Sequence, residues 1–320
     1  TLILVDGHRV TNNSRSIDPS TLPTLMERAQ KIAPAIAERA RWVEENREVH
    51  PDSMAEMIDV GLTRALQSHV YGGEEDNPAE IFMAIAELAK ACTSTAWLCL
   101  ILGVHTWEMA QLGQEVNDEM FADDPTTLMA SSYSHQGNVA EKVSGGYRLN
   151  GWWKSSTGST HSKWVVLGAE IPGNPIPHSF VVPLADPGVR LEDDWFVMGL
   201  RGTASRSVFC ENVFVPDHRV ADRDIIRGQY GPGLRWNTAP LYRVPQSYIY
   251  TCVSAAPALG TGWHYFEEWK QHYGFAKSVK RSIEGDRLIM VRMAQARADL
   301  SAAGCLAFAR LQEAYEVAVA

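Results

Sequence analysis

The spacing of the apolar residues changes twice along this chain, and this change limits the folds that it can adopt. In residues 1–125, apolar side chains recur every three or four positions, as on one face of a helix. In residues 126–225, short runs of β-branched and aromatic residues alternate with Gly, Pro and Asp, which is typical of strands and turns. Helical spacing returns in residues 226–320. Segregated helices and strands indicate an α+β fold rather than a parallel α/β fold.

The first zone carries signals for the ends of its helices. Pro34 interrupts the first apolar stripe and predicts a kink or a restart of the helix. A short helix from Asp52 should end at Gly61, and a new helix should begin at Asn77-Pro78, with Asn as the cap. The run that continues to Leu112 is apolar on more than one face, which predicts a helix enclosed within the fold.

The middle zone predicts an antiparallel β domain, either a small barrel or a sandwich. Gly145-Gly146 is a tight turn between two alternating runs, which is typical of a hairpin. Further short strands are expected over 164–171, 179–184, 195–199 and 207–215.

The third zone predicts two long helices, over 246–273 and 286–320. The second pattern reaches the last residue without a cap or a helix breaker, so we expect the natural protein to continue and this C-terminal helical bundle to be incomplete. Because long apolar helices cannot be covered within one chain, a homotetramer is expected. The predicted domains are an N-terminal helical domain (1–125), a central β domain (126–225) and a truncated C-terminal helical domain (226–320).

The composition excludes several classes of function. A net charge of −9 disfavours nucleic acid as a partner, because phosphate backbones need a basic surface. No apolar stretch approaches the roughly 18 residues that cross a bilayer, and the N-terminal residues lack the pattern of a signal peptide. The five cysteines are scattered, which favours reduced thiols and a cytoplasmic location.

Motifs for several common chemistries are missing. No GxGxxG follows a predicted strand, and the sequence has neither a P-loop nor a GxSxG elbow. The ten histidines do not fall at the spacing of metal ligands, so no metal site is predicted. Hydroxyl side chains instead gather in the β zone, at 131–135 and at 152–161. On composition alone, a turn-rich surface loop is the preferred interpretation of these residues.

Several blocks of sequence, in the same order, resemble one known family. The family consists of the oxygenase components of group D two-component monooxygenases, which use reduced flavin on an acyl-CoA dehydrogenase fold. It includes hydroxylases of 4-hydroxyphenylacetate and of a phenolic secosteroid. The matching blocks span roughly residues 50 to 300, and the best of them are 103–107, 131–133, 143–152, 156–158, 161–164, 198–205, 213–216 and 237–245.

The resemblance implies a division of labour between two proteins. A separate NAD(P)H:flavin reductase supplies FMNH2 or FADH2, and this chain binds the reduced flavin and O2. A C4a-hydroperoxyflavin then transfers one oxygen to a small aromatic or phenolic substrate. The task of the protein is to exclude water, to hydrogen-bond the flavin and to aim the substrate. The resemblance also implies a homotetramer.

The same resemblance gives three catalytic residues. Thr157 falls at the hydroxyl residue near flavin N5, and Ser132 falls at the hydroxyl that opens the β domain beside flavin and substrate. His105 falls at the histidine that faces the flavin and the phenol of the substrate. Without the family, His105 would be a satisfied core histidine, and Ser132 a strand-start serine that bonds to backbone.

Binding residues follow from the same positions. The predicted flavin contacts are Ser131, Ser132, Ser155, Ser156, Thr157 and Arg201. The predicted substrate contacts are His105, Tyr133 and Arg243. A surface salt bridge would explain either arginine equally well.

Two departures from the family pattern bear on the substrate. The loop Ser134–Asn138 is one residue longer than the usual Pro-Thr-Gly loop, which borders the active site. The family also carries a second catalytic histidine on its last helices, beyond the end of this sequence.

Three alternatives share part of the pattern. An acyl-CoA dehydrogenase would use a glutamate base, but the family's Thr-Glu-Pro-Gly-Ala-Gly-Ser-Asp element is absent and Glu267 and Glu268 are not distinguished from a solvated helix face. An N-hydroxylase of amines would share both fold and flavin chemistry. A non-catalytic flavin-binding relative is disfavoured by the set of His105, Ser132 and Thr157.

Overall fold

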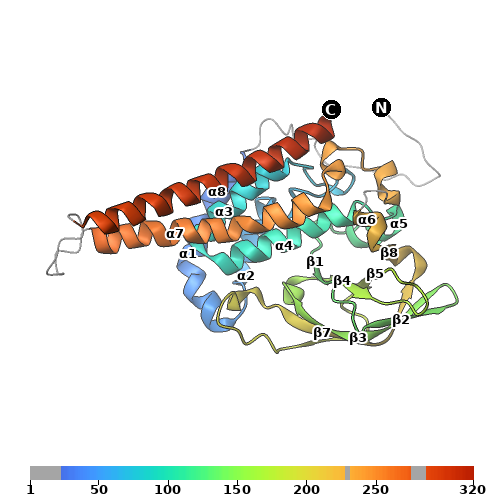
Figure 1. Cartoon of the computed structure of the whole chain (residues 1–320). Coiled ribbons are helices and arrows are strands. Elements are labelled where there is room, and N and C mark those ends of the chain that lie inside the picture. The colour runs from blue at the N-terminus through green and yellow to red at the C-terminus, as the bar shows by residue number, and fades with distance from the viewer. Residues whose placement is uncertain (1–22, 228–230, 275–285) are drawn as a thin grey trace.

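The computed structural model describes residues 23–227, 231–274 and 286–320. It consists of a layer of helices above a β domain (Figure 1). Within the helical layer, α7 and α8 run side by side in opposite directions and extend beyond the other helices at one end (Figure 1). The α-helices are α1 (Leu25–Asn46), α2 (Pro51–Asp59), α3 (Pro78–Ala91), α4 (Thr93–Met109), α5 (Gln114–Phe121), α6 (Arg223–Arg227), α7 (Ala256–Gly274) and α8 (Arg287–Val319). The domain boundary predicted after residue 225 falls inside α6.

Helix α1 is longer and more regular than the sequence predicted. A capping box between Thr24 and Glu27 begins the helix, and it continues through Pro34 to Asn46 without a restart. Pro34 is exposed, so burial of Ile32 and Ile36 on the opposite face outweighs the one backbone hydrogen bond that proline removes.

Most predicted helix ends are confirmed. Gly61 follows α2 with a φ of 80°, a left-handed conformation that favours glycine. The Asn77 side chain accepts from the Ala79 amide and begins α3. The apolar run to Leu112 is not one helix, because the extended backbone of Cys92 separates α3 from α4.

The β domain consists of two four-stranded sheets, ordered β1-β4-β5-β8 and β2-β3-β7-β6. The predicted hairpin is confirmed as β2 and β3, with Gly145 in the turn at a φ of 75°. The prediction of a wholly antiparallel domain is wrong, because β1 pairs with β4 in parallel. The strands are β1 (Met129–Ser132), β2 (Val139–Val143), β3 (Gly146–Ser156), β4 (Trp164–Ala169), β5 (His178–Pro183), β6 (Val189–Glu192), β7 (Arg206–Pro216) and β8 (Val220–Asp222).

The strand predicted over 195–199 is also wrong. That segment is a loop, and the edge strand of its sheet is β6 instead. The indole of Trp195 donates to the Leu200 carbonyl at 3.0 Å, so the segment folds on itself. Phe196 and Met198 are 71% and 97% exposed. The alternating apolar residues of this segment therefore do not form the buried face of a strand.

The predicted helix over 246–273 does not form as one regular helix. Its first turns are a π-helix, Tyr248–Cys252, and a 3-10 turn, Val253–Ala255, before α7 begins. By contrast, α8 begins as predicted, with the Asp286 side chain capping the amides of Leu288 and Ile289. The π-helix matters for the site, because it contains Tyr250.

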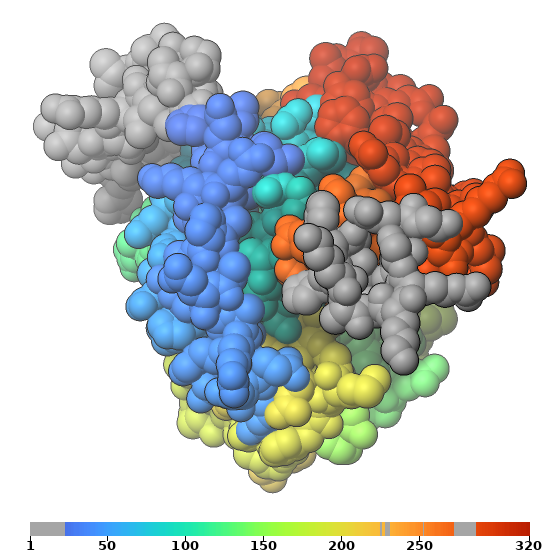
Figure 2. Space-filling view, turned by 90° about the vertical axis from the view of Figure 1, so that its left-hand side faces the viewer, coloured from blue at the N-terminus to red at the C-terminus, as the bar shows by residue number. Residues whose placement is uncertain are grey.

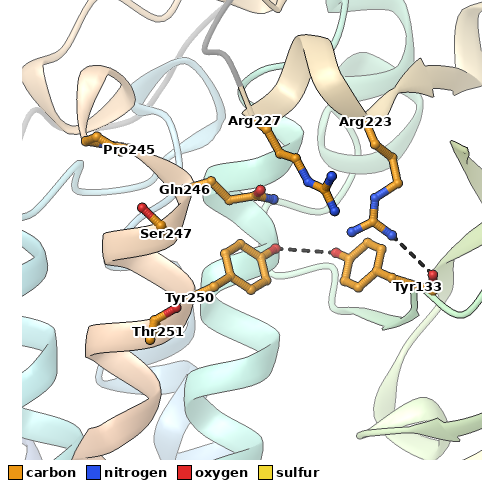
Figure 3. Close-up of a pocket in the computed structure, with 8 residues that line it drawn as sticks. All are labelled: Tyr133, Arg223, Arg227, Pro245, Gln246, Ser247, Tyr250 and Thr251. Carbon is orange, nitrogen blue, oxygen red and sulfur yellow. Dashed lines mark hydrogen bonds between the residues drawn. The ribbon is translucent and has the colours of Figure 1, made fainter. Parts of the chain in front are cut away.

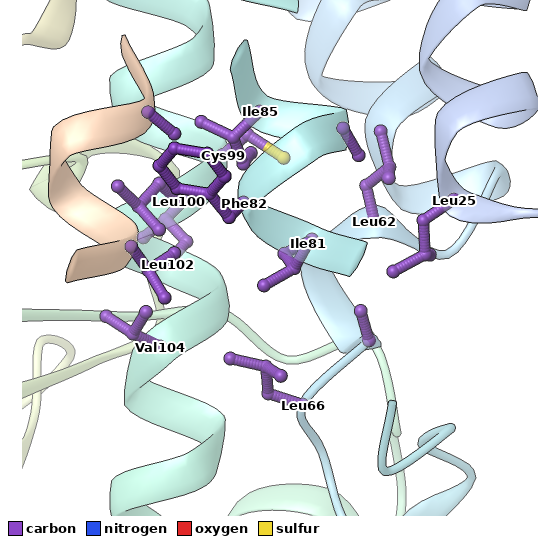
Figure 4. Packing of buried hydrophobic residues seen from close by; sticks show 14 of the residues in the cluster. Leu25, Leu62, Leu66, Ile81, Phe82, Ile85, Cys99, Leu100, Leu102 and Val104 are labelled. Atoms are coloured by element: carbon purple, nitrogen blue, oxygen red, sulfur yellow. The ribbon is translucent and has the colours of Figure 1, made fainter. Parts of the chain in front are cut away.

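The largest apolar core lies between α1, α3 and α4 and the helices of the third zone (Figure 4). Phe82, Ile85 and Leu88 of α3 are fully buried in it, and burial of each such side chain contributes about 1.5–3 kcal/mol. A second core around Trp153 and Phe180 fills the β domain. Among the described residues, no helix has the length and apolarity that a membrane crossing requires.

Helix α1 joins the two layers. It descends along one side of the molecule to the segment that follows β6 (Figure 2). There Arg47 forms a bidentate ion pair with Asp193, with both N–O distances at 2.8 Å. The junction of helices and β domain is therefore held at its edge, and the site lies further along this junction.

Candidate active site

Helix α4 carries two ionisable side chains into the junction with the β domain. Its apolar residues surround it on all sides, and it packs against β1. His105 and Glu108 are therefore almost fully buried, each with 1% of the residue exposed. Such groups need partners in the protein or in a ligand.

Two tyrosines complete a cluster around these residues. Glu108 Oε2 accepts a hydrogen bond from the hydroxyl of Tyr133, which follows β1. It accepts a second one from the hydroxyl of Tyr250, which lies in the π-helix, at an oxygen–oxygen distance of 2.6 Å. His105 Nδ1 lies 3.3 Å from each of the two hydroxyl oxygens. We call His105, Glu108, Tyr133 and Tyr250 the His–Glu–Tyr cluster.

Burial sets the protonation of this cluster. It lowers the pKa of His105 to about 3, so the imidazole is neutral at neutral pH. Burial raises the pKa of Glu108, and the two tyrosine hydroxyls oppose that rise. Burial and then the charge of Glu108 raise the pKa of Tyr133 and Tyr250, so both keep their hydrogens.

A pocket of about 420 Å³ opens beside the cluster (Figure 3). Arg223 and Arg227 of α6 point into it from one side, and the tyrosine rings form another side (Figure 3). The Arg223 guanidinium lies 4.4 Å over the Tyr133 ring and donates to the Tyr133 carbonyl at 3.2 Å. Among the described residues, the lining contains no acidic side chain; it consists of Tyr133, Arg223, Arg227, Pro245, Gln246, Ser247, Tyr250 and Thr251.

The hydroxyl of Thr157 belongs to a second polar group, one helical turn away along α4. Thr157 Oγ1 lies 2.9 Å from Ser205 Oγ, which lies 2.7 Å from Thr203 Oγ1. Thr203 donates to the Leu200 carbonyl at 2.9 Å. Gly158, with a φ of 72°, packs against Leu102 so closely that a Cβ would lie 3.0 Å from Leu102 Cδ2.

The end of β3 offers polar atoms that have no protein partner. Ser156 Oγ and Ser159 Oγ are buried and bond to nothing in the described part of the chain. Ser155 has a φ of 60°, which turns the strand at this point. Since buried hydroxyls are nearly always bonded, these residues fit the polar edge of a heterocyclic ring such as flavin.

Other predicted site residues are satisfied differently. Ser132 is buried and donates to the Lys154 carbonyl at 2.8 Å, which ties β1 to the end of β3. Ser131, its neighbour on β1, is half-buried. Arg201 lies near the start of α4 with Nε 3.5 Å from Glu44, and its side chain is 38% exposed. Arg243 is exposed and does not line the pocket described above.

The structure thus brings together only part of the predicted set. His105 and Tyr133 touch in the His–Glu–Tyr cluster, while Gly158, which directly follows Thr157, packs against the preceding turn of the same helix. The sequence reasoning missed Glu108, Tyr250, Arg223 and Arg227. An acidic residue three positions after His105 on an apolar helix was a usable signal for Glu108. Within the described ranges, no group of three His, Cys, Asp or Glu side chains could hold a metal ion.

Known proteins share this architecture. Residues 25–121 match the family model of the acyl-CoA dehydrogenase N-terminal domain. The chain is 35% identical over 286 residues to the flavin-dependent monooxygenase, oxygenase subunit HsaA, of Rhodococcus jostii, an alignment that covers 87% of this chain and 74% of that protein. It is 29% identical to the oxygenase component of p-hydroxyphenylacetate 3-hydroxylase of Acinetobacter baumannii, covering 78% of this chain and 59% of that one.

Solved structures agree. The 3-HSA hydroxylase from Rhodococcus sp. RHA1 superposes with a TM-score of 0.87 at 33% identity, covering 93% of this chain and 77% of that chain. XiaF from Streptomyces sp., in complex with FADH2, superposes with a TM-score of 0.81 at 26% identity, covering 92% and 76%.

A helical layer over two small sheets, with buried acid–base groups where they meet, defines a flavoenzyme of the acyl-CoA dehydrogenase fold. More narrowly, the chain belongs to the family of flavin-dependent monooxygenase oxygenase subunits. The predicted family, fold class, monooxygenase activity and use of flavin and O2 are confirmed. The names "oxygenase subunit" and "oxygenase component" imply a separate reductase partner.

Proposed function

We propose that this protein uses reduced flavin and O2 to hydroxylate a small phenolic substrate. The observation that carries the proposal is the buried Nε2 of His105, which has no partner in the described residues. The other ring nitrogen, Nδ1, lies 3.3 Å from the hydroxyls of Tyr133 and Tyr250, the two tyrosines that line the pocket. The relatives' names support the aromatic class, since they include a resorcinol hydroxylase and a p-hydroxyphenylacetate 3-hydroxylase.

Substrate binding is assigned to the neighbourhood of the His–Glu–Tyr cluster. Tyr133 supplies an aromatic wall, and Arg223 and Arg227 supply positive charge opposite any electron-rich oxygen of the ligand. His105, neutral because of its burial, accepts the hydrogen of the phenol. The exposed side chain of Arg243 gives no support to its predicted role as a substrate contact.

Flavin binding is assigned to the end of β3 and the start of β1. Ser155, Ser156 and Thr157 would hold the ring, with Ser131 and Ser132 beside it. Arg201, whose ion pair with Glu44 is long and partly exposed, remains free to meet an anionic part of the cofactor. When bound, the reduced flavin supplies the electrons that activate O2. The residues of this chain position the ring and keep water away from it.

The proposal extends to the surroundings of the enzyme. We infer an NAD(P)H:flavin reductase as the electron source, a cytoplasmic location and assembly as a homotetramer. The sequence offers no nicotinamide motif of its own, which supports an external reductase.

Isotope labelling tests the proposed reaction. The purified protein is incubated with 18O2, NADH, flavin and a separate flavin reductase, with resorcinol and 4-hydroxyphenylacetate as phenolic probes. We expect one labelled oxygen in the product and no product when the reductase is omitted. Oxidation of NADH by this protein and flavin without the reductase would contradict the proposal, as would an unlabelled product.

A further inference from the structure

The hydrogen bonds of the His–Glu–Tyr cluster have a direction that the geometry determines. Each tyrosine hydroxyl has a single hydrogen to donate. Both hydroxyls direct that hydrogen to the same atom, Glu108 Oε2, with the Tyr250 oxygen at 2.6 Å. Toward any other neighbour, Tyr133 and Tyr250 therefore act as acceptors.

His105 Nδ1 is that other neighbour. It lies 3.3 Å from both hydroxyl oxygens, so it can join the cluster only by donating a hydrogen that the two oxygens share. A neutral imidazole carries one hydrogen, and with that hydrogen on Nδ1 the lone pair is on Nε2. Nε2 is buried and has no partner in the described residues.

We propose that Glu108 is a positioning residue that fixes the tautomer of His105, with the hydrogen on Nδ1 and Nε2 as the proton acceptor. Glu108 acts through the two tyrosines, because its Oε2 lies 3.8 Å from His105 Nδ1. The tautomer follows from the contacts alone, and the use of Nε2 toward a phenol rests on the proposed function. The direction holds for an ionised Glu108 and also for one that is protonated on Oε1, since Oε2 is then free to accept.

Removal of the Glu108 carboxylate would reverse the direction of the hydrogen bond between His105 Nδ1 and the tyrosine hydroxyls. Without Glu108 Oε2, the described residues offer the hydroxyls of Tyr133 and Tyr250 no stronger acceptor than His105 Nδ1. One hydroxyl would then donate to Nδ1 and the other to the oxygen of the first, 3.3 Å away, and the ring hydrogen would move to Nε2. In that tautomer Nε2 is a donor, and it can no longer take the hydrogen of a phenol.

The tautomer of the unmodified protein is the first test. The full chain is labelled with 15N-histidine, and long-range 1H–15N correlation spectra at neutral pH identify which ring nitrogen carries the hydrogen. A His105→Asn variant assigns the signal. We expect the Nδ1–H tautomer for His105. An Nε2–H tautomer, or an equal mixture, overturns the proposal, whether or not the protein hydroxylates phenols.

Two variants of Glu108 give the second test. Glu108→Met removes the acceptor at similar volume, and Glu108→Gln keeps one side-chain oxygen that can accept from both hydroxyls. We expect the methionine variant to show Nε2–H and roughly a hundredfold lower turnover, in line with the contribution of a positioned acid–base group. The glutamine variant should keep Nδ1–H and most of the activity.

The variants also separate positioning from a merely structural role. Circular dichroism and thermal melting report whether each variant folds, and the spectra of the parent and of Glu108→Gln remain decisive if Glu108→Met does not. A folded Glu108→Met protein that keeps Nδ1–H overturns the proposal. A confirmed tautomer together with no hydroxylation of any phenol overturns the proposed function alone.

Discussion

At the scale of single residues, the chain of hydroxyls behind Thr157 has a direction of its own. Thr203 gives its hydrogen to the Leu200 carbonyl, so its oxygen accepts from Ser205, and Ser205 in turn accepts from Thr157. Thr157 Oγ1 therefore presents its lone pairs to a ligand. This suits a contact with an N–H group of reduced flavin.

We expect Thr157→Val to uncouple oxygen consumption from hydroxylation. The variant keeps the shape but loses one hydrogen bond worth about 0.5–1.5 kcal/mol, so peroxide release should quicken by roughly threefold to tenfold. Product per NADH and H2O2 per NADH measure this ratio in the coupled assay. Ser162→Ala is the matched control, because it removes a hydrogen bond to the Gly158 carbonyl in the same loop. Equal coupling in both variants would mean that Thr157 is only a turn residue.

His105 should also make stability depend on pH. Its pKa in the folded protein is about 3, whereas the unfolded chain has the ordinary value near 6.5. Between these values the unfolded state binds the extra proton, so the free energy of unfolding falls as the pH falls, by at most about 1.4 kcal/mol per pH unit. Urea midpoints at pH 7, 6 and 5 should drop less for His105→Asn than for the parent. An identical dependence in both proteins contradicts this prediction.

The sequence predicts those site residues that lie in recognisable blocks, but not those that reach the site through long-range contacts. His105, Thr157 and Ser132 were found because they occupy blocks of a recognisable family pattern. Tyr250 could not be found, since its contact with His105 joins residues 145 positions apart and no local pattern encodes that contact. Arg243 lies in a similar block, yet it is exposed, because a block of sequence predicts the placement of the backbone better than the direction of a long side chain.

At the scale of elements, caps and glycine turns were predictable and changes of helix type were not. Asn77, Gly61 and Asp286 mark ends through local hydrogen bonds or a positive φ, which sequence alone encodes. The π-helix Tyr248–Cys252 has no such signal, because its residues would also suit an α-helix. The parallel pairing of β1 with β4 likewise depends on how the sheets assemble.

Pro34 offers a test of how far packing overrides propensity in α1. The residue is exposed in the middle of a 22-residue helix, where it lacks a hydrogen to donate. Alanine is favoured over proline by about 3 kcal/mol in a helix interior, and loss of the rigid ring returns up to about 1 kcal/mol of entropy to the unfolded chain. We expect Pro34→Ala to raise the melting temperature. Glu38→Ala, exposed on the same helix, is the control and should leave it nearly unchanged; a lower melting temperature for Pro34→Ala would show that proline matters for packing.

At the scale of the whole molecule, the order of helices, strands and helices was correctly predicted from apolar spacing alone. The sequence does not distinguish a barrel from a sandwich, because the pattern of short strands is the same for both. The structure shows two separate four-stranded sheets. The two boundaries between the three predicted domains remain predictions.

The helical layer leaves apolar side chains uncovered, and this supports the predicted tetramer. Along α8, Leu288, Met290, Val291 and Leu306 are each more than half exposed. Burial of such a face against other copies would be favourable by about 25 cal/mol per Å² of apolar surface. Sedimentation velocity of the full-length protein at micromolar concentration should show a tetramer. A stable monomer under these conditions contradicts the prediction.

The His–Glu–Tyr cluster has a consequence for how the enzyme comes into being. Its hydrogen bonds and close contacts join residues 25, 28, 142 and 145 positions apart, so they depend on α4, on the residue that follows β1 and on the π-helix. Contacts of such large sequence separation form late in folding, after local helices. A chain still emerging from the ribosome can thus acquire helices and even a β domain while its imidazole has no fixed orientation. The site is complete only when the π-helix with Tyr250 has docked onto α4. An unfinished chain therefore has no site in which reduced flavin could be oxidised.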